Sequence, residues 1–313
     1  MIKVFGHKAP DTDSTGSAII WAWYLNEIKG QAAQAVLLGS PNTEAAFVTQ
    51  RWGFAAPEII ADVQSNAPVV IVDTNNPAEL PSNINQADIL AIIDHHKLVG
   101  GLETQGPISI TIRPLACTAT IMHDLMGDDA AQMPKPIKGV MLSCILSDTL
   151  AFRSPTTTAQ DEALAESLAA DLDLSLADYA ADMFAAKSDV SAFSDAELLR
   201  LDSKEYTVSG TKFRVSVLET TSPTTVLDRK ASLMEAMPSV AQEDEVDHVL
   251  LFVVDILNEE ATMLIPNATA QILAEKSFSR DYLSENFVTF LAFSSLFLVT
   301  PTKEGLRRRS FII

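Results

Sequence analysis

The amino-acid sequence predicts an α/β protein with a doubly wound, mostly parallel sheet in an N-terminal domain and a smaller mixed α/β C-terminal domain. In the first half, short apolar runs rich in β-branched residues alternate with helix-compatible segments, which is typical of parallel sheets. After about residue 195 the pattern changes to longer apolar runs and a hairpin signal. We therefore expect two domains with a boundary near residue 190.

Hydrophobic periodicity gives the expected elements in chain order. Strands are predicted at 2–5, 36–38, 69–72 and 89–93, and helices at 17–28, 44–52, 118–125, 137–146 and 161–170. The polar stretch KSDVSAFSD is typical of a linker, so we place the domains at 1–188 and 195–313, joined by 189–194. In the second domain, 206–208 and 213–218 flank Ser209-Gly210 as a hairpin, and the apolar runs 248–256 and 287–299 are expected to be buried as strand or helix.

Composition restricts the classes of function. The apolar fraction of 47% is enough for a real core, and the net charge of −19 makes long nucleic acid a poor partner. The surplus acid has two readings: a solubility trait, or an acidic chain that handles phosphate with the help of bound cations. Two cysteines without metal-like spacing, an N-terminus unlike a signal peptide and the lack of a long apolar stretch favour a cytoplasmic protein with no membrane span.

Carboxylates and imidazoles follow several of the predicted elements at their carboxyl ends. In chain order these residues are His7, Asp11, Asp13, Asp73, Asp94, His95, His96 and Asp148. Singly, each has a structural explanation, such as a helix N-cap at Asp13 or Ser14 or a turn at Asp73. Because the strand ends of a doubly wound sheet converge on one crevice, we expect these residues to form one site.

The chemistry of this set predicts bound metal ions. Converging carboxylates repel one another unless cations neutralise them. A mixture of imidazole nitrogens and carboxylate oxygens suits Mn²⁺, Fe²⁺, Co²⁺ or Zn²⁺ better than Ca²⁺, and the absence of thiolates counts against a structural zinc. The number of candidate ligands predicts two ions roughly 3.5–4 Å apart that share one carboxylate. The remaining histidines, His123 and His248, are expected to be surface or core residues.

These motifs, in this order, resemble the DHH phosphoesterase superfamily. The strings FGHKAPDTDS and SDTLAFRSPT are more similar still to family II inorganic pyrophosphatases, as are 117–120 and 201–205. The resemblance runs from residue 2 to about residue 265. It implies a metal-binding catalytic DHH domain, a substrate-binding DHHA2-like domain, an active site between the two, and a homodimer formed through the first domain.

The resemblance also implies a dinuclear Mn²⁺ or Co²⁺ centre, with Mg²⁺ arriving with the pyrophosphate substrate. The implied ligands are His7, Asp11 and Asp73 for one ion and Asp13, Asp73, His95 and Asp148 for the other. His96 is implied to face the substrate and Lys204 to reach it from the second domain. A water between the ions, with its pKa lowered towards neutrality, would attack one phosphorus atom while His96 protonates the leaving phosphate. Lys204 and Lys303 would neutralise phosphate oxygens as the second domain closes over the substrate.

Two departures from the family pattern bear on this interpretation. Thr74 stands where the family commonly has a histidine behind the metal ligands, which bears on metal preference and affinity. The Ser-Arg-Lys type motif that ends the second domain of the family has no clear counterpart here. Lys303 is the nearest match, whereas the run 307–309 is either a substitute or a solvated basic tail. From about residue 278 the chain stops resembling the family.

Two other readings compete with a pyrophosphatase. Another DHH enzyme, such as an exopolyphosphatase or an oligonucleotide or cyclic-dinucleotide phosphodiesterase, would share the metal site and differ in the second domain. The nucleotide-cleaving relatives carry a glycine-rich motif there, and no glycine cluster occurs between 195 and 313. A non-catalytic, metal-stabilised interaction protein would bind metal tightly without turnover, and nothing in the sequence favours it.

Overall fold

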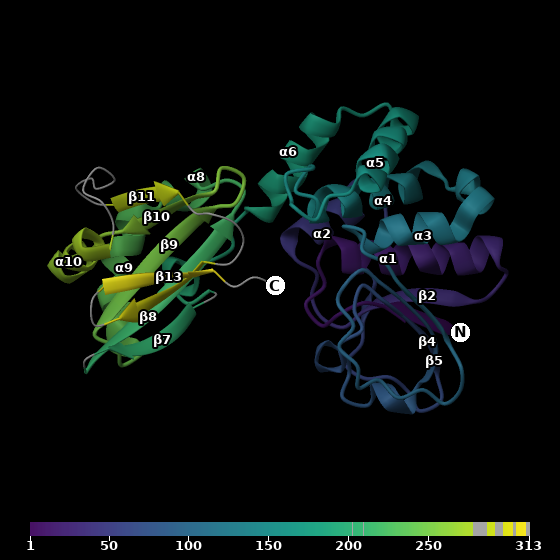
Figure 1. The fold of residues 1–313 in the computed structure, drawn as a ribbon, viewed down its shortest axis with the longest axis horizontal. Coiled ribbons are helices and arrows are strands. Elements are labelled where there is room, and N and C mark those ends of the chain that lie inside the picture. The colour runs from purple at the N-terminus through teal and green to yellow at the C-terminus, as the bar shows by residue number, and fades with distance from the viewer. Residues whose placement is uncertain (202, 209, 278–286, 292–296, 303–304, 311–313) are drawn as a thin grey trace. The chain divides into compact units, whose positions relative to one another are not determined.

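The computed structural model describes residues 1–201, 203–208, 210–277, 287–291, 297–302 and 305–310. The chain forms two compact units, Met1–Ala186 (unit 1) and Lys187–Ile313 (unit 2) (Figure 1). Within the described part of the chain, no helix combines the length and the apolar character needed to span a membrane.

Unit 1 is built on a six-stranded sheet in the order β3-β2-β1-β4-β5-β6, in which every neighbouring pair is parallel. Its strands are β1 (Ile2–Phe5), β2 (Ala33–Leu37), β3 (Glu58–Ile59), β4 (Pro68–Val72), β5 (Asp88–Asp94) and β6 (Ser109–Ile112). The chain first adds strands on one side of β1 and then returns to add β4 on the other. The crevice beyond the carboxyl ends of β1 and β4 is therefore the topological switch point, where ligands bind in such sheets.

The first two helices of unit 1 connect β1 to β2 and β2 to β3, and the other α-helices follow β6. The helices are α1 (Thr12–Trp23), continued by a π-helical turn Tyr24–Ile28, and α2 (Thr43–Arg51), α3 (Thr118–Met126), α4 (Lys135–Asp148), α5 (Ala159–Leu172) and α6 (Leu176–Lys187). Short 3-10 helices occur at Pro77–Glu79, Ile84–Gln86 and Gly127–Gln132. Helix α1 packs on β1 and β2 and against α4 (Figure 1). A Cβ at Gly16 would lie 2.3 Å from Sγ of Cys144, so the absence of a side chain lets these two helices approach closely.

Unit 2 contains a mixed five-stranded sheet in the order β11-β10-β9-β8-β7, with only β8 and β9 parallel. Its strands are β7 (Ser203–Val208), β8 (Thr211–Thr220), β9 (His248–Asp255), β10 (Glu260–Leu264) and β11 (Phe287–Leu291). Strands β12 (Phe297–Thr302) and β13 (Gly305–Ser310) form a separate antiparallel pair. The helices are α7 (Asp195–Leu198), α8 (Thr224–Leu227), α9 (Lys230–Glu243) and α10 (Ala268–Ser277).

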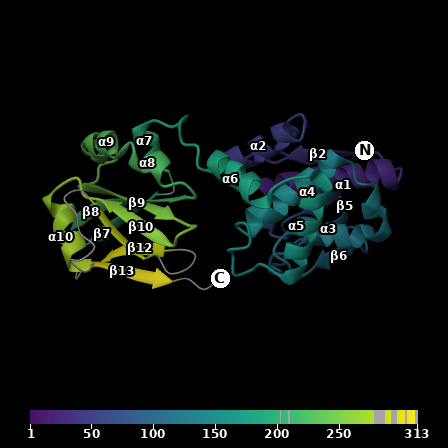
Figure 2. The ribbon, with the colours of Figure 1, turned by 90° about the horizontal axis from the view of Figure 1, so that it is seen from above.

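The apolar run 248–256 is continuous because both faces of β9 are buried. Its alternate side chains join two different cores, because successive residues of a strand point to opposite faces. Val249, Leu251 and Val253 pack with Leu233 and Met237 of α9. Leu250, Phe252 and Val254 pack on the other face with Ala270 and Ala274 of α10. Figure 2 shows α7 and α9 on one side of this sheet.

The predicted fold class is confirmed: a parallel sheet with covering helices, followed by a smaller mixed domain. Two details of the prediction were wrong. The first helix begins at Thr12 rather than at 17, and its N-cap is Asp11 rather than Asp13 or Ser14, because Asp11 Oδ1 accepts the Ser14 N–H at 2.9 Å. The apolar run 287–299 is not one element, since it contains β11 and the start of β12, with 292–296 outside the described residues.

Candidate metal centre

The loops after β1, β4 and β5 carry most of the side chains that the sequence singled out. His7 follows β1, Asp73 follows β4, and His95 and His96 follow β5. These strands are neighbours in the sheet, so their ends meet at the switch point. Asp148, the last residue of α4, completes the group.

Helix α1 positions two aspartates through its first turn. Asp11 caps the helix with one carboxylate oxygen, and its other oxygen, Oδ2, lies 3.6 Å from Nε2 of His7. Asp13, two residues later, is buried and accepts a hydrogen bond from Ser17 at 3.0 Å. The cap therefore fixes both carboxylates relative to the end of β1.

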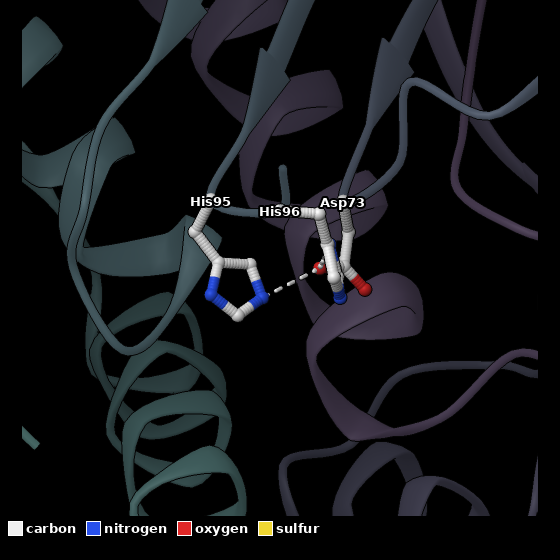
Figure 3. A group of neighbouring side chains, drawn as sticks. All are labelled: Asp73, His95 and His96. Atoms are coloured by element: carbon white, nitrogen blue, oxygen red, sulfur yellow. Dashed lines mark ion pairs between the residues drawn. The ribbon is translucent and has the colours of Figure 1, made fainter. Parts of the chain in front are cut away.

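Asp73 lies at the centre of the site. Its Oδ2 is 3.3 Å from Nε2 of His7, and its Oδ1 is 3.4 Å from Nε2 of His95. Figure 3 shows the carboxylate of Asp73 directed towards His95, with His96 beside it. Asp73 adopts a left-handed φ of 56°, a conformation that is costly for a non-glycine residue and concentrates at functional sites.

Among the described residues there are three groups of side chains in which the ligand atoms of each group lie within 4.8 Å of one another. The groups are Asp73–His95–His96, His7–Asp11–Asp73, and Asp13–Cys117–Asp148. Asp73 belongs to two of them, and Nε2 of His95 lies 3.8 Å from Oδ2 of Asp148, which links the third. The structure thus brings together every candidate ligand from unit 1 that the sequence indicated.

The N-terminus of α3 supplies donors that the sequence analysis did not assign. Asp13 accepts the backbone N–H of Thr118 at 2.7 Å and that of Ala119 at 3.3 Å. The Cys117 thiol donates to Oδ1 of Asp13 at 3.1 Å, and the Thr118 hydroxyl donates to Asp73 at 3.2 Å. The free N–H groups of a helix start favour an anion, so α3 stabilises the Asp13 carboxylate in its buried position. In the sequence, residues 117–120 are distinguished only by their resemblance to the family.

His96 is held by a second carboxylate whose role the sequence analysis did not identify. Nδ1 of His96 lies 2.9 Å from Oδ1 of Asp94, which also accepts the His96 backbone N–H at 3.0 Å. Asn75 donates to the other oxygen of Asp94 at 2.5 Å. Asp94 is fully buried, whereas half of the His96 side chain is exposed. In the sequence, the only indication that Asp94 holds His96 is that Asp94 directly precedes His95 and His96.

Thr74 follows Asp73 in the chain, and its hydroxyl forms two hydrogen bonds within the same loop. Thr74 is buried and donates to Oε2 of Glu79 at 2.7 Å, while its oxygen accepts the Asn76 N–H at 3.1 Å. Thr74 therefore has hydrogen-bond partners of its own within the loop after β4.

Burial and mutual repulsion dominate the electrostatics of the carboxylates. Burial, together with the charges of Asp13, Asp11 and Asp73, raises the pKa of Asp148 well above its ordinary value. Burial and the charge of Asp73 raise the pKa of Asp13 to about 6. Burial alone would also raise the pKa of Asp73, but hydrogen bonds with His7 and His95 outweigh it and lower that pKa.

The two imidazoles behave in the opposite way. Burial lowers the pKa of His7, but its bonds to Asp11 and Asp73 outweigh this effect and raise it to about 10. Burial likewise lowers the pKa of His95, but Asp73 and the neighbouring aspartates raise it to about 9. Protonated imidazoles thus partly neutralise the carboxylate cluster, which is the task a divalent cation would perform better.

The donor set fits a transition-metal centre. Oδ2 of Asp148 is buried and has no hydrogen-bond partner among the residues described, although buried carboxylate oxygens are normally paired. Imidazole nitrogens and carboxylate oxygens in close groups match the ligands that Mn²⁺ and its neighbours accept. The shared position of Asp73 suits a bridging carboxylate.

The other candidate residues are not members of the three groups above. Lys204 is exposed in β7 of unit 2. Lys303 lies outside the described residues. His123 lies in α3 and His248 begins β9, where its ring stacks on Phe213 with centroids 5.4 Å apart.

Comparison with known proteins agrees with the geometry. The model of the DHH family N-terminal domain matches residues 1–147, and the DHHA2 domain model matches residues 181–289. Proteins from Deinococcus radiodurans and Lactobacillus acidophilus, each named "probable manganese-dependent inorganic pyrophosphatase", are 39% and 32% identical to the chain. Each alignment covers 88% of the chain and 89% of the relative. A solved structure of a candidate family II inorganic pyrophosphatase from Methanococcus jannaschii superposes with a TM-score of 0.64, at 28% identity and over 94% of this chain and 95% of that one. The chain therefore belongs to the manganese-dependent, family II inorganic pyrophosphatases of the DHH superfamily.

Proposed function

We propose that this protein hydrolyses inorganic pyrophosphate to two phosphates at a dinuclear metal centre in unit 1. The observation that carries the proposal is Asp73, whose two oxygens face His7 on one side and His95 on the other. A carboxylate placed in this way can contribute to two ion sites at once. The relatives named above support pyrophosphate as the substrate.

The proposed ligands divide into two sets that share Asp73. His7, Asp11 and Asp73 would hold one ion, and Asp13, Asp73, His95 and Asp148 the other. Mn²⁺ or Co²⁺ would occupy these positions, with Mg²⁺ accompanying the substrate. Bound there, the ions supply a water of lowered pKa as the nucleophile and neutralise charge on the phosphate oxygens.

His96 is proposed as the general acid for the leaving phosphate. Its hydrogen bond to Asp94 raises its pKa, more than burial lowers it, and so favours the protonated ring. The same bond, together with Asn75 behind it, fixes the ring relative to Asp73. A protonated and oriented imidazole next to the metal ligands can deliver a proton to the phosphate that departs.

Unit 2 is proposed to supply the cationic contacts to substrate. Lys204 and Lys303 would each donate to phosphate oxygens as point charges, and closure of the second domain over the first would exclude water. We propose the domain limits 1–188 and 195–313 with a linker at 189–194. In the structure, residues 188–194 form neither helix nor strand.

A homodimer through unit 1 is also proposed. Strand β6 is at one edge of the six-stranded sheet, and its Ile110 side chain is 56% exposed. An unpaired strand edge with an exposed apolar residue favours pairing with a second copy.

The free thiols of Cys117 and Cys144 support a reducing, cytoplasmic environment.

Metal removal tests the proposal directly. We expect the chelated protein to release almost no phosphate from pyrophosphate and to recover more activity with Mn²⁺ or Co²⁺ than with Mg²⁺ alone. Tripolyphosphate and a dinucleotide, assayed in parallel, should be poor substrates. Full activity after chelation would contradict the metal centre, whereas faster release from tripolyphosphate or cleavage of the dinucleotide would indicate one of the other DHH activities.

A further inference from the structure

Glu44 is a fully buried carboxylate with no role in the proposed metal centre. It lies in the first turn of α2, one residue after the helix begins, and its exposed fraction is 0%. Carboxylates are almost never buried completely unless they are bound by other groups. The partners of Glu44 therefore indicate why it is there.

Two hydroxyl groups donate to the same oxygen of Glu44. The Thr12 hydroxyl lies 2.9 Å from Oε2, and the Ser147 hydroxyl lies 2.6 Å from it. Both hydroxyl residues are themselves buried. The oxygen thus connects the start of α1 to the end of α4 from a third element, α2.

Both hydroxyl residues are adjacent in the chain to proposed metal ligands. Thr12 stands between Asp11 and Asp13, and Ser147 immediately precedes Asp148. Each residue that Glu44 contacts is therefore joined by one peptide bond to a proposed ligand, and these ligands belong to both proposed ion sites. A shift of either segment would move a carboxylate of the metal centre.

We propose that Glu44 is a positioning residue for the metal centre, joining the Asp11–Asp13 turn to the Asp148 end of α4 through its two hydroxyl contacts. This inference rests on the proposed function, because it assumes that those aspartates hold metal. Groups that orient metal ligands from behind commonly change metal affinity or activity by about 10–100-fold when they are removed.

Packing elsewhere suggests that the fold survives the loss of Glu44. Helices α1 and α4 also meet at Gly16, where a Cβ would lie 2.3 Å from Cys144 and 2.9 Å from Val140. Asn42, not Glu44, caps α2 by accepting the Ala45 N–H at 2.8 Å. We therefore expect Glu44→Ala to loosen the ends of the two helices and to leave their contact intact.

The substitution Glu44→Gln separates geometry from charge. A glutamine retains a carbonyl oxygen that can accept both hydroxyls, but it has no negative charge. If Glu44 acts by holding Thr12 and Ser147, the glutamine variant should bind metal nearly as the wild type does. If Glu44 acts by its charge, glutamine and alanine should be equally impaired.

The experiment is a calorimetric Mn²⁺ titration of chelated wild type, Glu44→Ala, Glu44→Gln and Ser147→Ala, with thermal unfolding of each metal-free protein. We expect Glu44→Ala to bind Mn²⁺ about 10–100-fold more weakly, Ser147→Ala to show a smaller loss, and Glu44→Gln to be close to wild type. Ser143→Ala is the matched control, because Ser143 is a buried serine of the same helix that bonds to Tyr179 instead. It should leave the affinity for Mn²⁺ unchanged.

Each failure has a distinct reading. Wild-type protein that binds no Mn²⁺ would overturn the metal centre itself. If the wild type binds Mn²⁺ and Glu44→Ala binds it equally well, the role of Glu44 is overturned while the metal centre stands. Equal losses in the glutamine and alanine variants would overturn positioning through the two hydroxyl contacts, because they would mean that Glu44 acts by its charge. If Glu44→Ala does not fold, Ser147→Ala decides: unchanged affinity in that variant rejects the proposal.

Discussion

Asp73 and His95 face each other across the ends of two adjacent strands, with 3.4 Å between Oδ1 and Nε2 (Figure 3). The opposite oxygen of the same carboxylate lies 3.3 Å from His7. The side chain that follows β4 thus contacts imidazoles that follow β1 and β5, the strands on either side of β4. This arrangement makes Asp73 the residue on which both proposed ion sites depend.

Replacing Asp73 should therefore remove metal and activity together. In Asp73→Ala the carboxylate shared by the two proposed sites is lost, and we expect Mn²⁺ content and phosphate release to fall in parallel. Metal analysis of the dialysed protein, alongside a pyrophosphate assay, measures both quantities. Asp62→Ala, which alters an exposed aspartate, is the control and should change neither. A variant at Asp73 that kept its full complement of Mn²⁺ would show that the carboxylate is not a ligand.

Replacing His96 should have a different effect. His96→Gln leaves every proposed ligand in place, so metal content should stay while kcat falls by roughly 10²–10⁴, the usual contribution of a general acid. The control is His123→Gln, in a half-buried residue of α3, which should preserve kcat. If His96→Gln loses Mn²⁺ instead, then His96 is a ligand, as its proximity to Asp73 and His95 would also allow.

Metal affinity should rise with pH, because imidazole ligands must lose their protons to bind a cation. In the protein without metal, the pKa of His7 is about 10 and that of His95 about 9. Both exceed the unfolded value, so their ion pairs stabilise the metal-free fold fully at low pH and lose this contribution as pH rises through about 9 to 10. Over the same window metal binding meets less competition from protons.

We expect the apparent affinity for Mn²⁺ to increase from neutral pH to about 9, by up to about tenfold per pH unit for each proton displaced. Calorimetry in buffers with different ionisation enthalpies would count the protons released. Affinity that stayed constant across this range, without proton release, would mean that His7 and His95 are not ligands.

The clustering of the candidate residues could be expected from the sequence because it depends on strand ends. His7, Asp73 and His95 each follow a short apolar run, and parallel strands bring their carboxyl ends to one edge. No knowledge of side-chain packing was needed to expect that they meet.

The beginning of α1 was missed for the opposite reason. Residues 12–17 are small or polar, so they lack the apolar periodicity of a helix, yet they are buried against α4 and the metal centre.

The residues that hold the ligands could not be identified from the sequence. Glu44 is 32 residues from Thr12 and 103 from Ser147, and Thr118 is 105 from Asp13. Such contacts depend on how α2, α3 and α4 pack, which no local pattern specifies. Helix α9 was also not predicted, since Pro238 lies within it and proline normally argues against a helix interior.

Lys204 allows a test of the proposal that unit 2 supplies cationic contacts to the substrate. It lies in β7 opposite Val215 of β8, and it is exposed. Its neighbours Ser203 and Glu205 are both bound by Arg214, at 2.7 and 2.6 Å. Because successive side chains of a strand point to opposite faces, Lys204 points away from Arg214. Among the described residues, none forms a hydrogen bond or ion pair with its ammonium, which an anion could therefore approach.

Lys204→Ala removes one point-charge contact to phosphate, and a hydrogen bond to a charged group contributes about 1.5–3 kcal/mol. We therefore expect kcat/KM for pyrophosphate to fall by about 10–100-fold, while Mn²⁺ content and the thermal midpoint stay at wild-type values. Lys212→Ala is the matched control, because Lys212 is an exposed lysine of β8 whose ammonium approaches the Glu245 carbonyl at 3.4 Å. Steady-state kinetics on both variants decides the question. If the two substitutions have equal effects, Lys204 contributes only surface charge, and the cation that meets the substrate must come from another part of the chain.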